Sequence, residues 1–154
     1  MNPPTGFGKE VNQYLNHYIS VADAKAAGVL TVDLALAGYL LAQIPKASWS
    51  LGFHWTALLL ILASGTMALA ALYPRTPGIG SSAIFWEDVR ARPNLQVYLN
   101  DLGQTDQAEI ERQYGAQNYI VSGVLKSKYK AVQWAMRALM AALPATFIRL
   151  VIGA

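Results

Sequence analysis

The sequence predicts an all-α membrane protein, with three transmembrane helices and a small helical cytoplasmic headpiece inserted between the second and the third. Three observations predict this class: an apolar hairpin of two long runs, a third apolar run near the C-terminus, and a high overall hydrophobicity. Hydrophobic residues make up 54% of the 154 residues and charged residues only 14%. An ordinary soluble domain is about 25% charged. The chain is therefore too apolar for a soluble domain of its size.

The N-terminal part is expected to be a loose leader followed by an amphipathic helix. Prolines and glycines are frequent in residues 1–8, which disfavours an ordered element there. Apolar residues then recur at steps of three and four, as on one face of a helix; they are Val11, Tyr14, Leu15, Tyr18, Ile19 and Ala22. The first long apolar run starts only after this segment and exceeds the length of a signal-peptide core, so we expect a retained anchor.

The first two spans are predicted at residues 26–44 and 56–72. A helix rises about 1.5 Å per residue, so about 20 apolar residues cross a hydrocarbon core about 30 Å thick. Each run is close to that length. A short turn carrying Trp49 and Trp55 joins the two runs, and amphipathic aromatic side chains favour the membrane interface.

Charged residues near the first span have two different expected roles. Asp23 and Lys25 stand just before it and are expected at the interface, where a lysine ammonium can reach the headgroups. Asp33 lies inside the span, roughly 10 Å deep at helical rise. A carboxylate there costs about 2.5 to 3.5 kcal/mol unless it finds a partner. Asp33 is therefore a candidate gating residue or a structural pairing residue.

The segment between the second and third spans predicts two short helices and one long one. Ser82 is expected to cap the first helix, which Pro93 ends, and Asn94 to cap the second. Thr105 is the expected N-cap of a long helix that continues into the third span, because no proline follows before Pro144.

The third span is interrupted by two arginines. Arg149 is near its far end and is expected to extend outward to the interface. Arg137 is about as deep in the membrane as Asp33 and is the second candidate gating residue. An ion pair between Asp33 and Arg137 would relieve both penalties. The four expected segments are the leader and amphipathic helix (1–25), the transmembrane hairpin (26–73), the cytoplasmic helical region (74–130) and the third transmembrane helix (131–154).

Basic residues predict the orientation. They precede the first span, follow the second and precede the third, whereas the turn after the first span holds only Lys46. By the positive-inside rule, the N-terminus and residues 74–130 face the cytoplasm and the C-terminus faces the periplasm.

Several functional classes are excluded by composition. The chain has no cysteine, which excludes disulfides and thiolate chemistry. Its net charge of +3 comes from scattered Lys and Arg rather than a basic stripe, so nucleic-acid binding is not predicted. No catalytic constellation or metal-ligand cluster stands out, and we expect neither an enzyme nor a bound cofactor.

The cytoplasmic region does carry the side chains of a small-ligand site. Arginine suits a phosphate, lysine adds point charge, tryptophan can stack on a base, and carboxylate or amide groups can hydrogen-bond. The candidate ligand-binding residues are Arg75, Trp86, Asp88, Arg90, Gln117, Lys126 and Lys128. The alternative is that these residues form a solvated helical headpiece with some internal pairs.

Four motifs give the chain a family resemblance. They are Ala22-Asp23-Ala24-Lys25-Ala26, Tyr73-Pro74-Arg75, Phe85-Trp86-Glu87-Asp88-Val89, and Gln117 with Ser122, Lys128 and Tyr129. In this order around three spans, they resemble the transmembrane effector family of Pycsar antiphage defence, from about His17 to the third span. Asp33 departs from the family pattern, which tends to have Asn there, so that position's role is not carried over.

The resemblance implies a multi-pass protein of the bacterial inner membrane. It implies a response to a cyclic pyrimidine mononucleotide, cUMP or cCMP, that a partner pyrimidine cyclase makes on phage infection. The expected outcome is damage to the lipid bilayer and growth arrest, with assembly of the effector into a homo-oligomer. Two other classes stay open on the residues alone: a small constitutive channel or transporter subunit, and a membrane adaptor without a nucleotide ligand.

Overall fold

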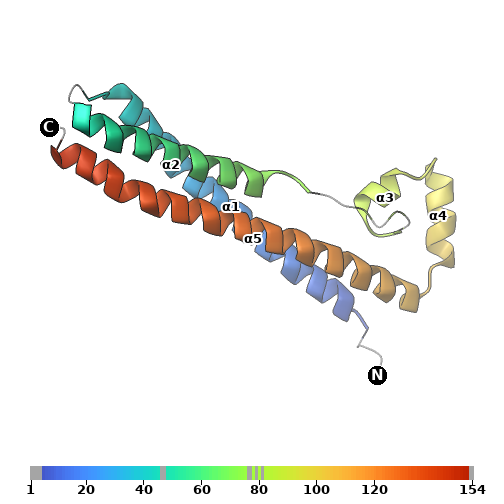
Figure 1. Cartoon of the computed structure of the whole chain (residues 1–154). Coiled ribbons are helices and arrows are strands. Elements are labelled where there is room, and N and C mark those ends of the chain that lie inside the picture. Colours follow the sequence, from blue (N-terminus) through green and yellow to red (C-terminus); the bar gives the residue numbers. More distant parts are fainter. Residues whose placement is uncertain (1–4, 46–47, 76–77, 79, 81, 153–154) are drawn as a thin grey trace. The chain divides into compact units, whose positions relative to one another are not determined.

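The computed structural model describes residues 5–45, 48–75, 78, 80 and 82–152, and in this part its regular structure is helical (Figure 1). The helices are α1 (Phe7–Ala42), α2 (Ser48–Leu72), α3 (Trp86–Arg90), α4 (Leu95–Gln104) and α5 (Gln107–Ile152). By length and composition, α1, α2 and α5 can each cross a membrane. The predicted all-α class is confirmed, with three helices that are candidates to span a membrane.

The long helices continue well beyond the apolar runs. Helix α1 has 36 residues and joins the predicted amphipathic segment to the first span without a break. Helix α5 has 46 residues and continues without a break into the third span, as the lack of a proline before Pro144 predicted. Pro144 itself lies inside this helix.

Local capping agrees with the sequence at one helix and differs at two. Asn94 caps α4, accepting a hydrogen bond from the Val97 backbone N–H at 3.0 Å. Helix α5 is capped by Asp106, which accepts from the Glu109 N–H at 2.7 Å, while the predicted cap Thr105 donates instead to the Asp101 carbonyl. The residue before α3 is Phe85, so the predicted cap Ser82 is wrong. The Ser82 hydroxyl instead accepts from the Ile84 and Phe85 N–H groups, each at 3.1 Å, and so stabilises the turn before the helix.

The chain forms two compact units. Unit 1 comprises Met1–Ser20 and Pro74–Lys126, and unit 2 comprises Val21–Tyr73 and Ser127–Ala154. In the described part of the segment between α2 and α5, the helices are the short α3 and α4. A separate headpiece inserted between the second and third spans is therefore not supported in that form, because unit 1 also includes the start of α1 and the first part of α5.

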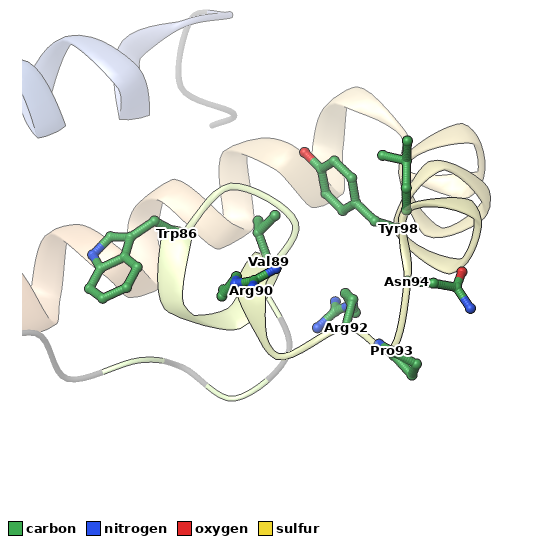
Figure 2. A pocket seen from close by; sticks show the side chains of 8 residues that line it. Trp86, Val89, Arg90, Arg92, Pro93, Asn94 and Tyr98 are labelled. Atoms are coloured by element: carbon green, nitrogen blue, oxygen red, sulfur yellow. The ribbon is translucent and has the colours of Figure 1, made fainter.

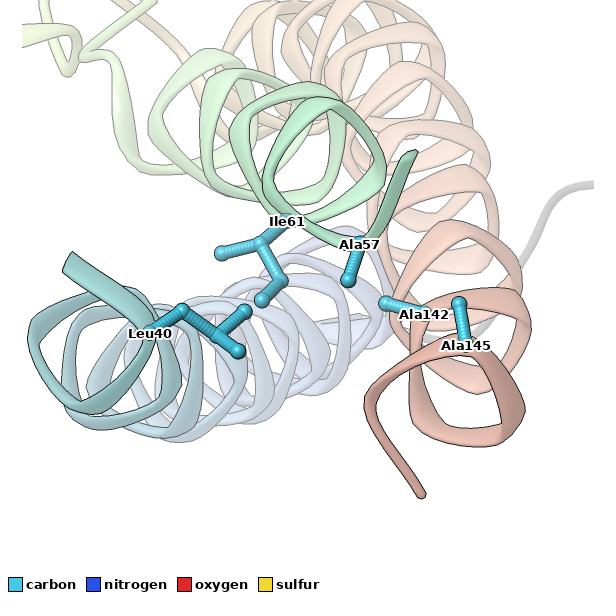
Figure 3. Packing of buried hydrophobic residues seen from close by; sticks show 5 residues of the cluster. All are labelled: Leu40, Ala57, Ile61, Ala142 and Ala145. Carbon is cyan, nitrogen blue, oxygen red and sulfur yellow. The ribbon is translucent and has the colours of Figure 1, made fainter. Parts of the chain in front are cut away.

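Unit 2 packs three long helices through small side chains. One buried cluster takes residues from α1, α2 and α5 (Figure 3); its members are Leu40, Ala57, Ile61, Ala142 and Ala145. A second cluster contains Ala26, Ala71 and Val132. Alanine at these contacts lets helix backbones approach closely, which is how membrane helices gain van der Waals contact without a hydrophobic driving force.

Candidate functional site

The turn before α3 in unit 1 is held by a buried carboxylate. Asp88 is 5% exposed, and its two oxygens accept hydrogen bonds from the Gly80 and Ser82 N–H groups, each at 3.0 Å. A Cβ on Gly78 would lie 2.7 Å from Asp88 Oδ1, so the backbone approaches the carboxylate too closely for a side chain there. Asp88, a predicted ligand residue, thus binds its own chain.

A buried glutamine attaches this turn to α5. Gln113 Oε1 accepts from the Ala83 N–H at 2.9 Å, and its Nε2 donates to Glu109 at 2.9 Å. Tyr98 of α4 donates its hydroxyl to the Ala83 carbonyl at 3.2 Å. Hydrogen bonds therefore fix the α3–α4 segment on the start of α5.

The start of α1 is bound to α5 in the same way. Asn118 donates to the Gly8 carbonyl at 2.8 Å and accepts from Asn12 at 2.9 Å. Glu111 accepts from the Gly6 and Gly8 N–H groups at 2.6 and 3.1 Å. Such buried polar groups are expected to be paired, and here the pairing joins segments more than 100 residues apart.

A pocket of about 660 Å³ lies between α3 and the start of α4 (Figure 2). It is lined by Trp86, Val89, Arg90, Arg92, Pro93, Asn94, Leu95 and Tyr98. Trp86 is 59% exposed, whereas Arg92 is fixed by Asp101, at 2.8 Å, and by the Asp88 carbonyl. Arg90 is exposed and forms no ion pair among the residues that the structure describes. The pocket is therefore lined by both the aromatic face of Trp86 and the exposed guanidinium of Arg90.

The pocket includes two of the seven predicted ligand residues, Trp86 and Arg90. Arg75 and Lys126 are exposed, and Gln117 is half-buried, and none of these three lines it. Arg92, Asn94 and Tyr98 were missed by the sequence prediction. Pro93 was a usable signal, because a proline that ends one helix next to a capping asparagine predicts a turn that exposes the residues around it.

In unit 2, the predicted ligand residue Lys128 is part of a buried polar contact. It is 4% exposed, and its ammonium donates to Asp23 and to the Ala71 carbonyl, each at 2.6 Å.

The other predicted interface residues lie elsewhere in unit 2. The ammonium of Lys25 is 5.6 Å from the Tyr129 ring centroid. Trp55 is 53% exposed, and the side chain of Trp49 lies outside the described residues.

A second polar contact surrounds Asp33. The hydroxyl of Ser64 lies 2.8 Å from Asp33 Oδ2 and 2.9 Å from the Ala135 carbonyl. The other oxygen, Oδ1, is buried without a hydrogen-bond partner among the described residues. The predicted ion pair with Arg137 is not formed within the chain: Arg137 is exposed and lies over the Trp134 ring, 4.9 Å from its centroid.

A third polar contact lies at the far end of the spans. Arg149 is 7% exposed and donates to the carbonyl of Gln43, just beyond the end of α1, so its guanidinium lies at the far end of the spans but is buried against the chain itself. Its guanidinium lies 5.9 Å from the Tyr39 ring centroid. His54 is fully buried, and neither ring nitrogen has a partner in the described part of the chain. The carbonyl and the ring give the guanidinium partners inside the bundle.

The two outer contacts give the position of Asp33 along the spans. Asp23 lies in α1, and Gln43 follows the last residue of that helix, 20 residues further on. This separation is about 30 Å at helical rise, which is the thickness of the hydrocarbon core of a bilayer. Their partners on α5 are 105 and 106 residues further along the chain. Asp33, midway between them, therefore lies near the centre of the span.

The family model for the Pycsar effector protein domain, PycTM, matches residues 7–153. The chain belongs to the Pycsar effector family. A curated relative, the Pycsar effector protein SaPycTM of Staphylococcus aureus, is 25% identical over 128 residues, which cover 78% of this chain and 77% of the relative. No solved structure matches the chain.

Family membership confirms the resemblance seen in the motifs around Asp23, Arg75 and Trp86. It supports a role as a non-enzymatic antiphage effector that acts with membrane helices. It also implies a cyclic-nucleotide signal and a cyclase partner.

Proposed function

We propose that this protein is a membrane effector triggered by a cyclic pyrimidine mononucleotide, cUMP or cCMP. On binding, the protein oligomerises or repacks and impairs the inner membrane, which stops growth of the infected cell. The observation that carries the proposal is the pocket of unit 1, where an exposed Trp86 lies together with Arg90, which forms no ion pair among the described residues, in a chain of this family.

The pocket has the size and chemistry for a mononucleotide. Its volume of about 660 Å³ is within the usual range for small-molecule sites. Trp86 offers a ring face, and base–aromatic stacking contributes about 1–3 kcal/mol. Arg90 offers a planar guanidinium that can bind phosphate oxygens through two parallel hydrogen bonds.

The remaining predicted residues have supporting roles in this proposal. Asp88 fixes the turn and, through its carbonyl, Arg92 at one wall of the pocket. Arg75 and Lys126 are exposed in unit 1 and contribute long-range attraction for an anion, and Gln117 is too far along α5 to line the pocket. Lys128 holds Asp23 and serves the fold of unit 2.

Orientation follows from the basic residues. We place the N-terminus and unit 1 in the cytoplasm, where a cyclase would release its product, and the C-terminus in the periplasm. A ligand shifts only an equilibrium whose states it distinguishes, so the nucleotide must bind one arrangement of the protein more tightly than the other.

The test is nucleotide binding by the purified full chain in lipid nanodiscs, scanning cUMP, cCMP, cAMP and cGMP. Selective binding of a cyclic pyrimidine is expected, with Trp86→Ala and Arg90→Ala each weakening it about tenfold or more. Lys9→Ala removes one exposed positive charge of unit 1 outside the pocket and is the matched control. Absence of binding, together with conductance in liposomes without nucleotide, would contradict the proposal and favour a constitutive channel.

A further inference from the structure

Arg137 is a cation near the centre of the spans, and it has no anionic partner among the residues that the structure describes. It follows Lys128, which belongs to the polar contact at one end of the spans, by nine residues, or about 14 Å of helix. Its only described contact is the ring of Trp134, itself 51% exposed. A charged side chain at this depth is costly unless it is paired, and the distance to either headgroup region is too long for the side chain to cover easily.

Asp33 is the complementary group at the same depth. It is 2% exposed, Ser64 satisfies one oxygen, and the other oxygen has no partner among the described residues. The offset of 105 to 106 residues between α1 and α5 puts Asp33 level with residues 138 and 139 of α5. Arg137 is within two residues of that level.

The two groups cannot meet within one copy of the chain. Ala135 faces Ser64 and Asp33, since its carbonyl accepts from the Ser64 hydroxyl. Residues two apart on a helix point about 200° from one another. Arg137 is therefore turned away from Asp33 and lies exposed on the outer face of α5.

Asp33 instead contributes to a groove on the outer face of α1 and α2. The groove has a volume of about 410 Å³ and is otherwise lined mainly by apolar side chains, among them Leu30, Leu34 and Leu62. Leu34 and Leu62 are 66% and 67% exposed. A guanidinium can enter where these flexible leucine side chains move aside.

We propose that this groove binds α5 of a second copy of the same chain, so that Arg137 of the second copy pairs with Asp33. Copies related by rotation about the membrane normal keep every residue at its depth, so the two charges meet without any shift along the membrane normal. Each copy carries both the groove and the arginine, on different helices. The interface is therefore head-to-tail and closes into a ring when the rotation closes.

This interface deepens the proposed function. It rests on that proposal only for the idea that assembly of the protein damages the membrane. The Asp33–Arg137 pair that the sequence predicted within one chain is here a pair between two copies. A lipid acyl chain in the groove is the competing occupant, but it would leave Arg137 and the free oxygen of Asp33 unpaired.

The experiment uses the absence of cysteine in the sequence. Leu34→Cys and Met136→Cys, made together in the full chain, place one thiol beside Asp33 and one beside Arg137, both at exposed positions. Mild oxidation in bilayers is expected to give a ladder of disulfide-linked multimers. The control is Leu69→Cys with Met136→Cys. Leu69 is also exposed and lines the same groove, but at a different depth along the spans. This control pair is therefore expected to give no ladder.

Charge exchange then tests the pair itself. In the double-cysteine chain, Asp33→Arg alone and Arg137→Asp alone are each expected to lose the ladder, since like charges would meet. An equal mixture of these two variants is expected to restore it, because alternating copies pair every arginine with an aspartate. Asp33→Asn and Arg137→Gln remove one charge each and introduce no new one, and both are expected to weaken the ladder. These neutral variants are the control for the possibility that a reversed charge simply prevents insertion into the membrane.

The outcomes separate the two proposals. A ladder restored by mixing supports the interface, whether or not cUMP or cCMP increases it; a nucleotide without effect counts only against the proposed trigger. Two results would overturn the interface. The first is that the double-cysteine chain with native Asp33 and Arg137 inserts into the bilayer but forms only intramolecular disulfides. The second is that both charge variants insert and lose the ladder, and mixing them fails to restore it. Lipid retained in the groove under those conditions would identify the acyl chain as the occupant.

Discussion

Units 1 and 2 differ in how completely their buried polar groups are paired. In unit 1, the buried side chains Asp88, Gln113 and Asn118 each hydrogen-bond to main-chain groups. In unit 2, Asp33, His54 and Arg149 are buried, and each keeps at least one polar atom without a partner among the described residues. Because an unpaired buried polar group is costly, the hydrogen bonds of the first set stabilise the fold of unit 1, and Asp33 in the second set is the group for which we propose a partner in a second copy.

The largest expected effect is the loss of a satisfied group in unit 1. Asp88→Ala removes a carboxylate that accepts two backbone hydrogen bonds in the turn before α3. We expect unit 1 to lose about 3 kcal/mol of stability, seen as faster hydrogen exchange at the Gly80 and Ser82 amides. Asp88→Asn keeps one acceptor and should lose less, and Glu87→Ala, at an exposed neighbour, should leave the exchange unchanged. Equal exchange in Asp88→Ala and wild type would show that the carboxylate does not hold the turn.

A smaller effect is expected in unit 2, where hydrogen bonds between membrane helices are weaker than burial suggests. Ser64→Ala removes the hydroxyl that lies between Asp33 and the Ala135 carbonyl. We expect a loss of about 0.6 to 1.7 kcal/mol, measured by unfolding in mixed micelles. Thr66→Ala, whose exposed hydroxyl bonds only to its own helix, is the control. If Ser64→Ala lost as much stability as Asp88→Ala, the buried hydrogen bonds of the two units would contribute equally, and the expected difference between the units would be wrong.

The smallest expected effect is at an exposed ion pair of unit 1. The Arg112 guanidinium, bonded at 2.7 Å, and the Gln113 amide lower the pKa of Glu109 from 4.5 to about 2. A depressed pKa stabilises the folded state above the unfolded value, and this stabilisation is lost as pH falls from about 4.5 to about 2. Because the Arg112 side chain is 71% exposed and solvent screens the pair, we expect only a slight fall in melting temperature over that range. Glu109→Gln should abolish this part of the pH dependence; an unchanged profile would argue against it.

Depth was predictable from the sequence, whereas the direction of each side chain was not. The lengths of the apolar runs gave three spans, and counting residues placed Asp33 and Arg137 at one level. Which face of α5 carries Arg137 depends on how α5 packs against α1 and α2, and that packing comes from contacts between distant residues such as Ser64 and Ala135. The same reason explains why Lys128 and Arg149 proved to be buried.

The pocket shows a similar limit. Trp86 and Arg90 were identifiable because an aromatic and a basic residue stand together in one short motif. Arg92, Asn94 and Tyr98 join them only because the chain turns at Pro93 and α4 begins at Leu95. Asn94 was predicted as a cap, a role that gave no sign of a place in a pocket.

The separation of the two outer polar contacts also bears on the lipids that surround unit 2. Asp23 with Lys128 and Gln43 with Arg149 are about 30 Å apart along the helices. A thicker bilayer would draw these charged contacts into hydrocarbon, and a thinner one would expose leucines to water, so hydrophobic mismatch would tilt or repack the helices. Acyl-chain length is therefore a physical variable to which this effector is expected to respond.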